Sequence, residues 1–76
     1  MKQQLFKIKL YEANSNKLKK ESYVYEFDDD CLNANLFYDA VEEFKDIIEP
    51  GDIIKYLNEE IRYNNDGTGT IIILGQ

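Results

Sequence analysis

The 76-residue sequence contains no histidine, no tryptophan, one proline and one cysteine, Cys31. A single cysteine excludes a disulfide within the chain, which fits a reducing cytosol better than a small secreted scaffold. The longest unbroken apolar run, 71–74, is far shorter than the roughly 20 residues that cross a bilayer. The N-terminus has no export signal. We therefore expect a cytoplasmic protein without a membrane segment.

Recognisable catalytic and metal-binding arrangements are also missing. No histidine is available as a general base, and Cys31 follows three aspartates, a setting that does not activate a thiol as a nucleophile. The run Asp28, Asp29 and Asp30 lacks the spacing and the glycine of a calcium loop, and one cysteine does not make a zinc site. The glycines of "GTG", 67–69, precede no helix, as a phosphate-binding loop would require. The sequence predicts a protein that is not an enzyme and carries no metal or cofactor.

What is present describes one small globular domain that spans residues 1–76. Apolar residues make up 43% and charged residues 32% of the chain, the balance of a folded rather than a disordered sequence. A core of this size, without a disulfide or metal, provides only about 3–5 kcal/mol of net stability. Residue types encoded by AT-rich codons are abundant, which suggests a low-GC bacterium or one of its phages.

Two alternating stretches at the N-terminus predict a β-hairpin. Apolar residues alternate with lysines in 5–11, and the same two-residue period returns in 21–27. The segment between them, 12–17, is rich in asparagine and serine, which favour turns. The aromatic residues that share one face of the second strand are Tyr23, Tyr25 and Phe27.

A change of period predicts one long amphipathic helix over 34–48. Asn33 or Asn35 is available as its N-cap, and Pro50 with Gly51 ends it. Apolar residues recur there at steps of three and four; they are Leu36, Phe37, Ala40, Val41, Phe44, Ile47 and Ile48.

The C-terminal part predicts a second short element and a second hairpin. We expect 52–61 to form a helix capped by Asp52, although a strand is the alternative for this segment. The Asp-Gly in 64–69 favours a hairpin turn, and the strand that follows is apolar on both faces, so it is predicted to be central in the sheet or covered by a partner. The expected fold is α+β, with an antiparallel sheet of about four strands in the order ββα(α)ββ and the long helix on one face.

Charge is distributed very unevenly along the chain. The net charge is −6, but residues 1–20 contain six lysines and one acid, whereas residues 21–76 contain fourteen acids and three bases. Such asymmetry is typical of a chain that uses charge to recognise a partner.

The predicted helix carries an acidic stripe on the side opposite its apolar face. Acids three or four positions apart repel each other by about 0.2–0.5 kcal/mol per pair, and acids near a helix C-terminus also oppose the helix dipole. Asp28, Asp29 and Asp30, which precede the helix, are favourable there. Because interleaved lysines would stabilise the helix better, we interpret the acids as a recognition surface, with an ordinary solvated face as the alternative. The stripe consists of Asp39, Glu42, Glu43, Asp46 and Glu49, flanked by Tyr38.

In size, charge and residue usage the chain is similar to the small acidic inhibitors that phages encode against host nucleases, including DNA mimics and anti-CRISPR proteins. No sequence motif carries this similarity. It implies a basic nucleic-acid-binding protein or nuclease as the partner, with no direct contact to nucleic acid. The predicted binding residues are Asp28, Asp29, Asp30, Tyr38, Asp39, Glu42, Glu43, Asp46 and Glu49.

Two other functions stay open at the level of sequence. The protein is either an accessory protein that associates through its apolar C-terminal strand, for example as a homodimer, or a nucleic-acid binder that uses the hairpin lysines. In the second case Tyr11 and Tyr23 stack on bases. The net charge of −6 opposes that function, and lysines also protect an exposed edge strand.

Overall fold

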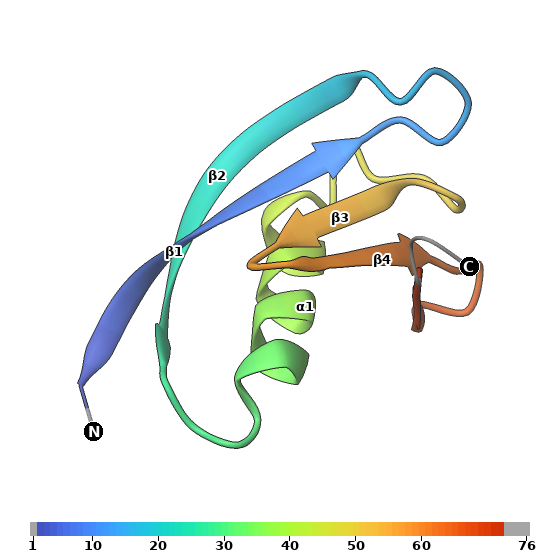
Figure 1. The fold of residues 1–76 in the computed structure, drawn as a ribbon. Coiled ribbons are helices and arrows are strands. Elements are labelled where there is room, and N and C mark those ends of the chain that lie inside the picture. Colours follow the sequence, from blue (N-terminus) through green and yellow to red (C-terminus); the bar gives the residue numbers. More distant parts are fainter. Residues whose placement is uncertain (1, 73–76) are drawn as a thin grey trace.

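The computed structural model describes residues 2–72, in which five strands and one helix follow in the order β1, β2, α1, β3, β4, β5. The antiparallel sheet with one helix on one face confirms the predicted α+β class, with one strand more than expected (Figure 1). The bounds are β1 Gln3–Tyr11, β2 Leu18–Phe27, α1 Leu32–Glu43, β3 Ile53–Tyr56, β4 Glu59–Tyr63 and β5 Gly69–Ile71.

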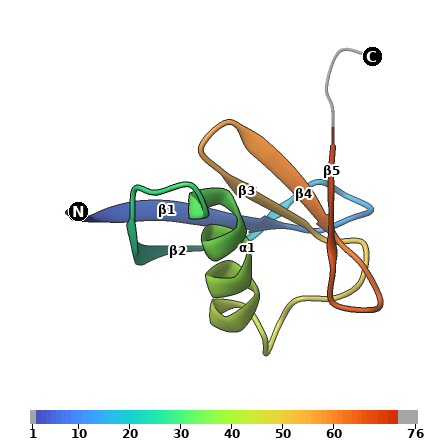
Figure 2. The same ribbon diagram turned by 90° about the horizontal axis from the view of Figure 1, so that it is seen from below.

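The sheet has the strand order β2-β1-β3-β4-β5, and every neighbouring pair is antiparallel. Helix α1 lies against one face of this sheet, and no second helix in residues 2–72 covers the opposite face (Figures 1 and 2). The core therefore forms a single layer between α1 and the sheet. Its buried side chains are Ile8, Leu10, Leu36, Phe37, Ala40, Phe44, Ile54, Tyr56 and Ile61.

The predicted first hairpin is confirmed and is longer than the sequence pattern indicated. β1 pairs with β2 from Gln3↔Phe27 to Tyr11↔Leu18, with a register shift next to Leu10. The shift follows from the extra residue on β2, because Leu10 pairs with Lys20 while Tyr11 pairs with Leu18, leaving Lys19 over. Only the last three residues of β1 pair with β3, so the hairpin extends beyond the rest of the sheet (Figure 1).

Helix α1 occupies Leu32–Glu43 rather than the predicted 34–48. It begins after Cys31, so neither Asn33 nor Asn35 is the N-cap, and the capping position makes no side-chain hydrogen bond. It ends where Phe44 takes φ −100° and ψ 11°, and a turn continues to residue 47. Glu42 and Glu43 bring negative charge to the negative end of the helix dipole, which favours this early end.

The segment 52–61 forms strands, so the prediction of a second helix is wrong. Ile54 and Ile61 pair directly across β3 and β4 and both are buried under α1. A seven-residue separation puts two side chains on one face both in a helix and in a hairpin with a two-residue turn, so spacing alone does not decide. The turn consists of Leu57 and Asn58, and Leu57 has a left-handed φ of 51°. The turn contains no glycine, so the sequence gives no clear signal for it. The β-branched isoleucines of this segment favour strands.

The second predicted hairpin is present, but its last strand is not central. β5 follows the loop 64–68, in which Gly67 has φ 86°, and it lies at the edge of the sheet beyond β4. Ile71 is 60% exposed, and the apolar residues 73 and 74 lie outside the described residues. Gly69 sits against the helix layer: a methyl group there would lie 2.6 Å from Ile61 Cγ2 and 2.8 Å from the ring of Phe37.

Asp52 was predicted to cap a second helix and instead joins three parts of the chain. It is 2% exposed, and its carboxylate accepts hydrogen bonds from Lys19 Nζ at 2.7 Å, Glu49 N at 2.9 Å and Ala13 N at 3.3 Å. Lys19 also donates to the carbonyl oxygen of Ile47 at 3.0 Å. The hydrogen bond to Asp52 raises the pKa of Lys19, against the opposing effect of burial. A buried charge needs such partners, and here they tie the first hairpin to the segment between α1 and β3.

Candidate binding surfaces

The sequence-predicted acids surround α1 on the side away from the sheet, and we call them, together with Tyr38, the acidic surface. Asp29 and Asp39 are half-buried, and the other six acids are exposed. Tyr38 is 67% exposed, so it lies beside the acids as predicted. The acidic surface comprises Asp28, Asp29, Asp30, Tyr38, Asp39, Glu42, Glu43, Asp46 and Glu49.

The acidic surface is not a single helical stripe. Only Asp39, Glu42 and Glu43 belong to α1, because the helix ends at Glu43, and the predicted helical stripe from Asp39 to Glu49 is wrong beyond that point. Asp46 lies in the following turn, and Glu49 lies in the segment that leads to β3. The acids thus run from the loop before the helix, along its outer side, to the loop after it.

Several of these acids already have local partners. Asp29 Oδ1 accepts a hydrogen bond from Cys31 N at 2.9 Å and so supports the turn into α1. Glu42 forms a surface ion pair with Lys45 at 3.1 Å, and such exposed pairs contribute only about 0–1 kcal/mol. Glu43 Oε1 accepts a hydrogen bond from Ser22 Oγ of β2 at 2.9 Å. Local partners therefore explain the positions of Asp29, Glu42 and Glu43 but not those of the other acids.

A second surface, not identified as a unit from the sequence, lies on the opposite side of the sheet. Strand alternation turns Phe6, Ile8 and Leu10 toward α1 and their neighbours away from it. Paired residues of adjacent strands face the same way, so the register defines this open sheet face. Its members are Leu5, Lys7, Lys9 and Tyr11 of β1, Glu21, Tyr23, Tyr25 and Phe27 of β2, Ile53 and Lys55 of β3, and Glu60 and Arg62 of β4.

Cations and aromatic rings are interleaved on the open sheet face. Lys7 Nζ lies 5.7 Å from the ring centroid of its cross-strand partner Tyr23, and Lys55 Nζ lies 4.3 Å from that of Tyr11. Both contacts are within the distance at which a ring attracts a cation. The hydrogen bond with Glu21, followed by the charge effect of Tyr23, raises the pKa of Lys7.

Two acids share this face with the cations. Glu21 pairs with Lys7 at 3.3 Å and Glu60 pairs with Lys55 at 3.6 Å. Lys9 and Arg62 make no ion pair within residues 2–72. The open sheet face therefore carries four cations against two acids.

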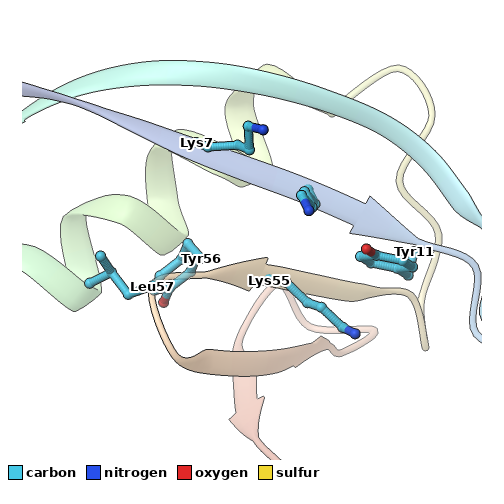
Figure 3. Close-up of a pocket in the computed structure, with 6 residues that line it drawn as sticks. Lys7, Tyr11, Lys55, Tyr56 and Leu57 are labelled. Carbon is cyan, nitrogen blue, oxygen red and sulfur yellow. The ribbon is translucent and has the colours of Figure 1, made fainter.

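A hollow of about 400 Å³ opens between β1 and β3 on this face (Figure 3). It forms because β1 continues toward its N-terminus while β3 stops pairing with it at Lys9↔Lys55. Leu57 stands at its rim, 56% exposed, in a left-handed conformation that costs a non-glycine residue about 1–2 kcal/mol. The lining residues are Lys7, Lys9, Tyr11, Lys55, Tyr56 and Leu57.

Neither surface assembles groups suited to covalent or metal chemistry. Within residues 2–72 no three potential metal ligands cluster together, and Cys31 is an exposed free thiol. Tyr56 is buried on the α1-facing side of the sheet, where its hydroxyl group donates to the carbonyl oxygen of Asn33 at 2.9 Å. Burial raises the pKa of Tyr56 to about 12. Over the same residues, no helix is both long and apolar enough to cross a membrane. The two surfaces offer charge, aromatic rings and apolar contact as means of binding.

Comparison with family models, with curated proteins and with solved structures finds no match for this chain.

Proposed function

We propose that this chain is a non-enzymatic binding protein of the bacterial cytoplasm, and that its acidic surface occupies the basic groove of a nucleic-acid-handling protein. In this function it acts as an inhibitor of the DNA-mimic, anti-restriction or anti-CRISPR type, encoded by a phage or another mobile element. Carboxylates offered along an extended surface replace the phosphates that such a groove normally binds.

One observation carries this proposal. Residues 28–49 contain eight acids and one base, and the fold displays these acids around α1, on the side of the sheet opposite Lys7, Lys9 and Lys55. The chain keeps its lysines on other elements, although lysines four positions from Glu42 or Asp39 would stabilise the helix. The single base of the segment, Lys45, pairs with Glu42 at 3.1 Å and leaves the other acids uncompensated.

The experiment is affinity capture from a nuclease-treated low-GC bacterial lysate with three versions of the protein. The first is the native chain, and the second carries Asp39→Lys, Glu42→Lys, Glu43→Lys and Asp46→Lys. The third is a matched control that reverses four acids outside the acidic surface, namely Glu12→Lys, Glu21→Lys, Glu59→Lys and Glu60→Lys. Each variant changes the net charge from −6 to +2, so the two differ in the location of the charge and not in its amount.

The expected result is capture of a basic nucleic-acid-handling protein by the native chain and by the control, and its loss with the acidic-surface variant. The complex is also expected to weaken with salt over the range in which exposed charges are screened and to be displaced by duplex DNA. Capture of the same proteins by all three versions would refute the proposal. Circular dichroism of each variant shows whether it is folded.

The edge strand β5 favours one other function. Its outer side has no neighbour in the described sheet, and Ile71, which shares the α1-facing side of the sheet with its partner Ile61, is 60% exposed, as expected for an accessory protein that associates through this edge. Sedimentation over a range of concentrations separates the two functions. An oligomer that is insensitive to salt and lost with Ile71→Lys supports association through β5, whereas a monomer at all concentrations leaves the acidic surface as the binding site.

A further inference from the structure

The open sheet face presents large aromatic side chains that do not contribute to the core. Tyr23, Tyr25 and Phe27 are 54%, 62% and 44% exposed, and they recur at every second position of β2 on the side away from α1. Neighbouring rings in this row are therefore about 6.6–6.8 Å apart along the strand. Burial does not explain three exposed rings in one row, because the apolar contribution of a side chain depends on the area removed from water.

Lysines in the adjacent strands follow the same period. Lys7 lies opposite Tyr23, the first ring of this row, and Lys9 lies two positions further along β1, opposite Glu21. Lys55 lies directly opposite Lys9 on β3. Like charges directly opposite each other in a sheet are destabilising. Lys55 pairs with Glu60 at 3.6 Å, and Lys9 has Glu21 opposite it on β2, although Glu21 forms its ion pair with Lys7. A bound anion would relieve the remaining repulsion at the hollow that both lysines line.

We propose that the open sheet face binds single-stranded nucleic acid, which goes beyond the function proposed for the acidic surface and does not depend on it. Bases stack on the exposed rings, and phosphates meet the cations between them. Stacking on aromatic side chains combined with a basic surface is the usual mode for single strands. The stacking residues are Tyr11, Tyr23, Tyr25 and Phe27, and the phosphate-binding residues are Lys7, Lys9, Lys55 and Arg62.

The spacing of the rings selects a single strand over a duplex. Bases stacked in a duplex rise about 3.4 Å each, half the separation of neighbouring rings in β2. Only an extended strand with separated bases can place one base on each ring, and a duplex hides the base faces altogether. The proposal therefore differs from the sequence-based expectation of no direct nucleic-acid contact, which rested on the net charge of −6 and not on where the charges lie.

The two acids of this face set the expected strength. Glu21 and Glu60 already hold Lys7 and Lys55, so binding of a phosphate to either lysine must compete with an ion pair. Lys9 lies opposite Glu21, but within residues 2–72 neither Lys9 nor Arg62 makes an ion pair. Two to four phosphates neutralised on a single strand give a log K against log salt slope of about −1.4 to −2.8.

The same face also suits the acidic surface of a second copy by charge, but the observations favour a single strand. Each copy carries a net −6, so copies repel each other at a distance. Head-to-tail contact of two different surfaces would also generate closed rings or open filaments rather than a simple dimer. A face that offers both aromatic rings and cations suits a chain that carries both bases and phosphates.

The test is fluorescence anisotropy with labelled oligothymidylate and oligouridylate of about 12 nucleotides, a length within the usual site size of a single-strand-binding domain. The full-length native chain is compared with Tyr25→Ala, with Lys9→Glu and with two controls on the acidic surface side, Tyr38→Ala and Lys45→Glu. A duplex of the same length is measured alongside. Loss of one stacked base is expected to weaken binding by about 5- to 150-fold in Tyr25→Ala.

The expected result is single-strand binding that is stronger than duplex binding, falls with salt at the slope given above, and is weakened by Tyr25→Ala and Lys9→Glu but not by the controls. Absence of single-strand binding at millimolar protein, or equal weakening by control and test variants, overturns the proposal. Sedimentation of the same proteins tests whether a second copy occupies the face. If Lys9→Glu abolishes a self-associated state and oligonucleotides do not bind, the face is an interface between copies instead. The acidic-surface variant is expected to keep oligonucleotide binding, which separates this proposal from the preceding one.

Discussion

The two faces of the molecule carry opposite charge and are built in different ways. The acidic surface is assembled from one continuous stretch of sequence, residues 28–49, that passes along α1. The open sheet face is assembled from two hairpins, β1–β2 and β3–β4, which are separated in the sequence by α1 and meet through the pairing of β1 with β3. A surface of the first kind can be found by inspecting a helix, whereas a surface of the second kind appears only when the strands are paired.

Both faces belong to one folded unit, and Asp52→Ala is the substitution expected to destabilise that unit most. The substitution leaves Lys19 without its buried partner and removes the acceptor of Glu49 N and Ala13 N. We expect a loss of about 3 kcal/mol in the free energy of unfolding, measured by urea denaturation. The exposed neighbour Asp46→Ala serves as the control and is expected to change stability by less than about 0.5 kcal/mol. Equal effects of the two substitutions would show that the buried junction does not hold the faces together.

Gly69→Ala is expected to push β5 away from α1 at the other end of the sheet. The new methyl group would lie 2.8 Å from Cε1 and Cζ of Phe37 on α1 and 2.6 Å from Ile61 on β4, so it forces β5 away from the core. The expected cost is about 1–3 kcal/mol. Phe37→Leu removes the ring atoms that the methyl group meets, so the double variant should lose less than the sum of the two single variants. Additive losses in thermal or urea unfolding would contradict the close approach.

Tyr56 connects the sheet to the start of α1, and its contribution depends on pH. Burial raises its pKa from 10.0 to about 12, so the unfolded chain releases this proton first. Its stabilising contribution is therefore complete below pH 10 and is lost as the pH rises toward 12. Tyr56→Phe loses the hydrogen bond to Asn33, at a cost of about 1 kcal/mol near neutral pH. The difference in unfolding free energy between the native protein and Tyr56→Phe should therefore disappear in urea titrations at alkaline pH. A difference that stays constant with pH would contradict the raised pKa of Tyr56.

The smallest expected effects sharpen the contrast between stability and binding. Asp39→Lys removes repulsion with Glu42 and Glu43, whereas Lys9→Glu exchanges the like-charge pair with Lys55 for a like-charge pair with Glu21. Asp39→Lys should raise the free energy of unfolding by about 0.2–1 kcal/mol, and Lys9→Glu should leave it within about 0.5 kcal/mol of the native value, while each weakens the binding proposed for its own face. Precise thermal melts of both variants measure this. A fall in stability for either variant would mean that its charge serves the fold.

The parts of the fold that the sequence predicted are those in which local pattern and final environment agree. The first hairpin follows from the alternation of Phe6, Ile8 and Leu10, and the turn before β5 follows from Asp66 and Gly67. Asp66 accepts hydrogen bonds from Thr68 N at 3.0 Å and from its hydroxyl group, and these bonds lower the pKa of Asp66. Such turns are closed by their own side chains, so they can be recognised without knowledge of the rest of the molecule.

The errors arose where tertiary contacts decide between two local possibilities. Ile54 and Ile61 are compatible with a helix or a hairpin, and only their pairing under α1 selects the hairpin. The helix was predicted to continue to residue 48 because Ile47 and Ile48 keep its period, but the hydrogen bonds around Asp52 belong to a different path of the chain. The predicted acidic residues are at the surface, and their proposed role remains a prediction.

The open sheet face was only partly visible in the sequence. Alternation in 21–27 puts Tyr23, Tyr25 and Phe27 on one side of a strand, but it does not say whether that side is covered. The answer depends on the register, because Tyr25 pairs with Leu5 and Tyr23 with Lys7 rather than with the buried residues of β1. A lysine among the cross-strand partners is the one sequence signal that would have indicated the exposed side.

The first hairpin extends beyond the rest of the sheet, and this affects how fast its backbone amides exchange with solvent. From Gln3 to Ile8, β1 has a neighbour on one side only, whereas Leu10 lies between Lys20 of β2 and Ile54 of β3. Amide hydrogens at the outer end should therefore exchange with deuterium by local fraying, and those near Leu10 only through larger openings. Lys7 and Tyr23 lie in this outer part of the hairpin. A ligand bound to the open sheet face should therefore slow amide exchange in a part of the sheet where exchange is otherwise fast.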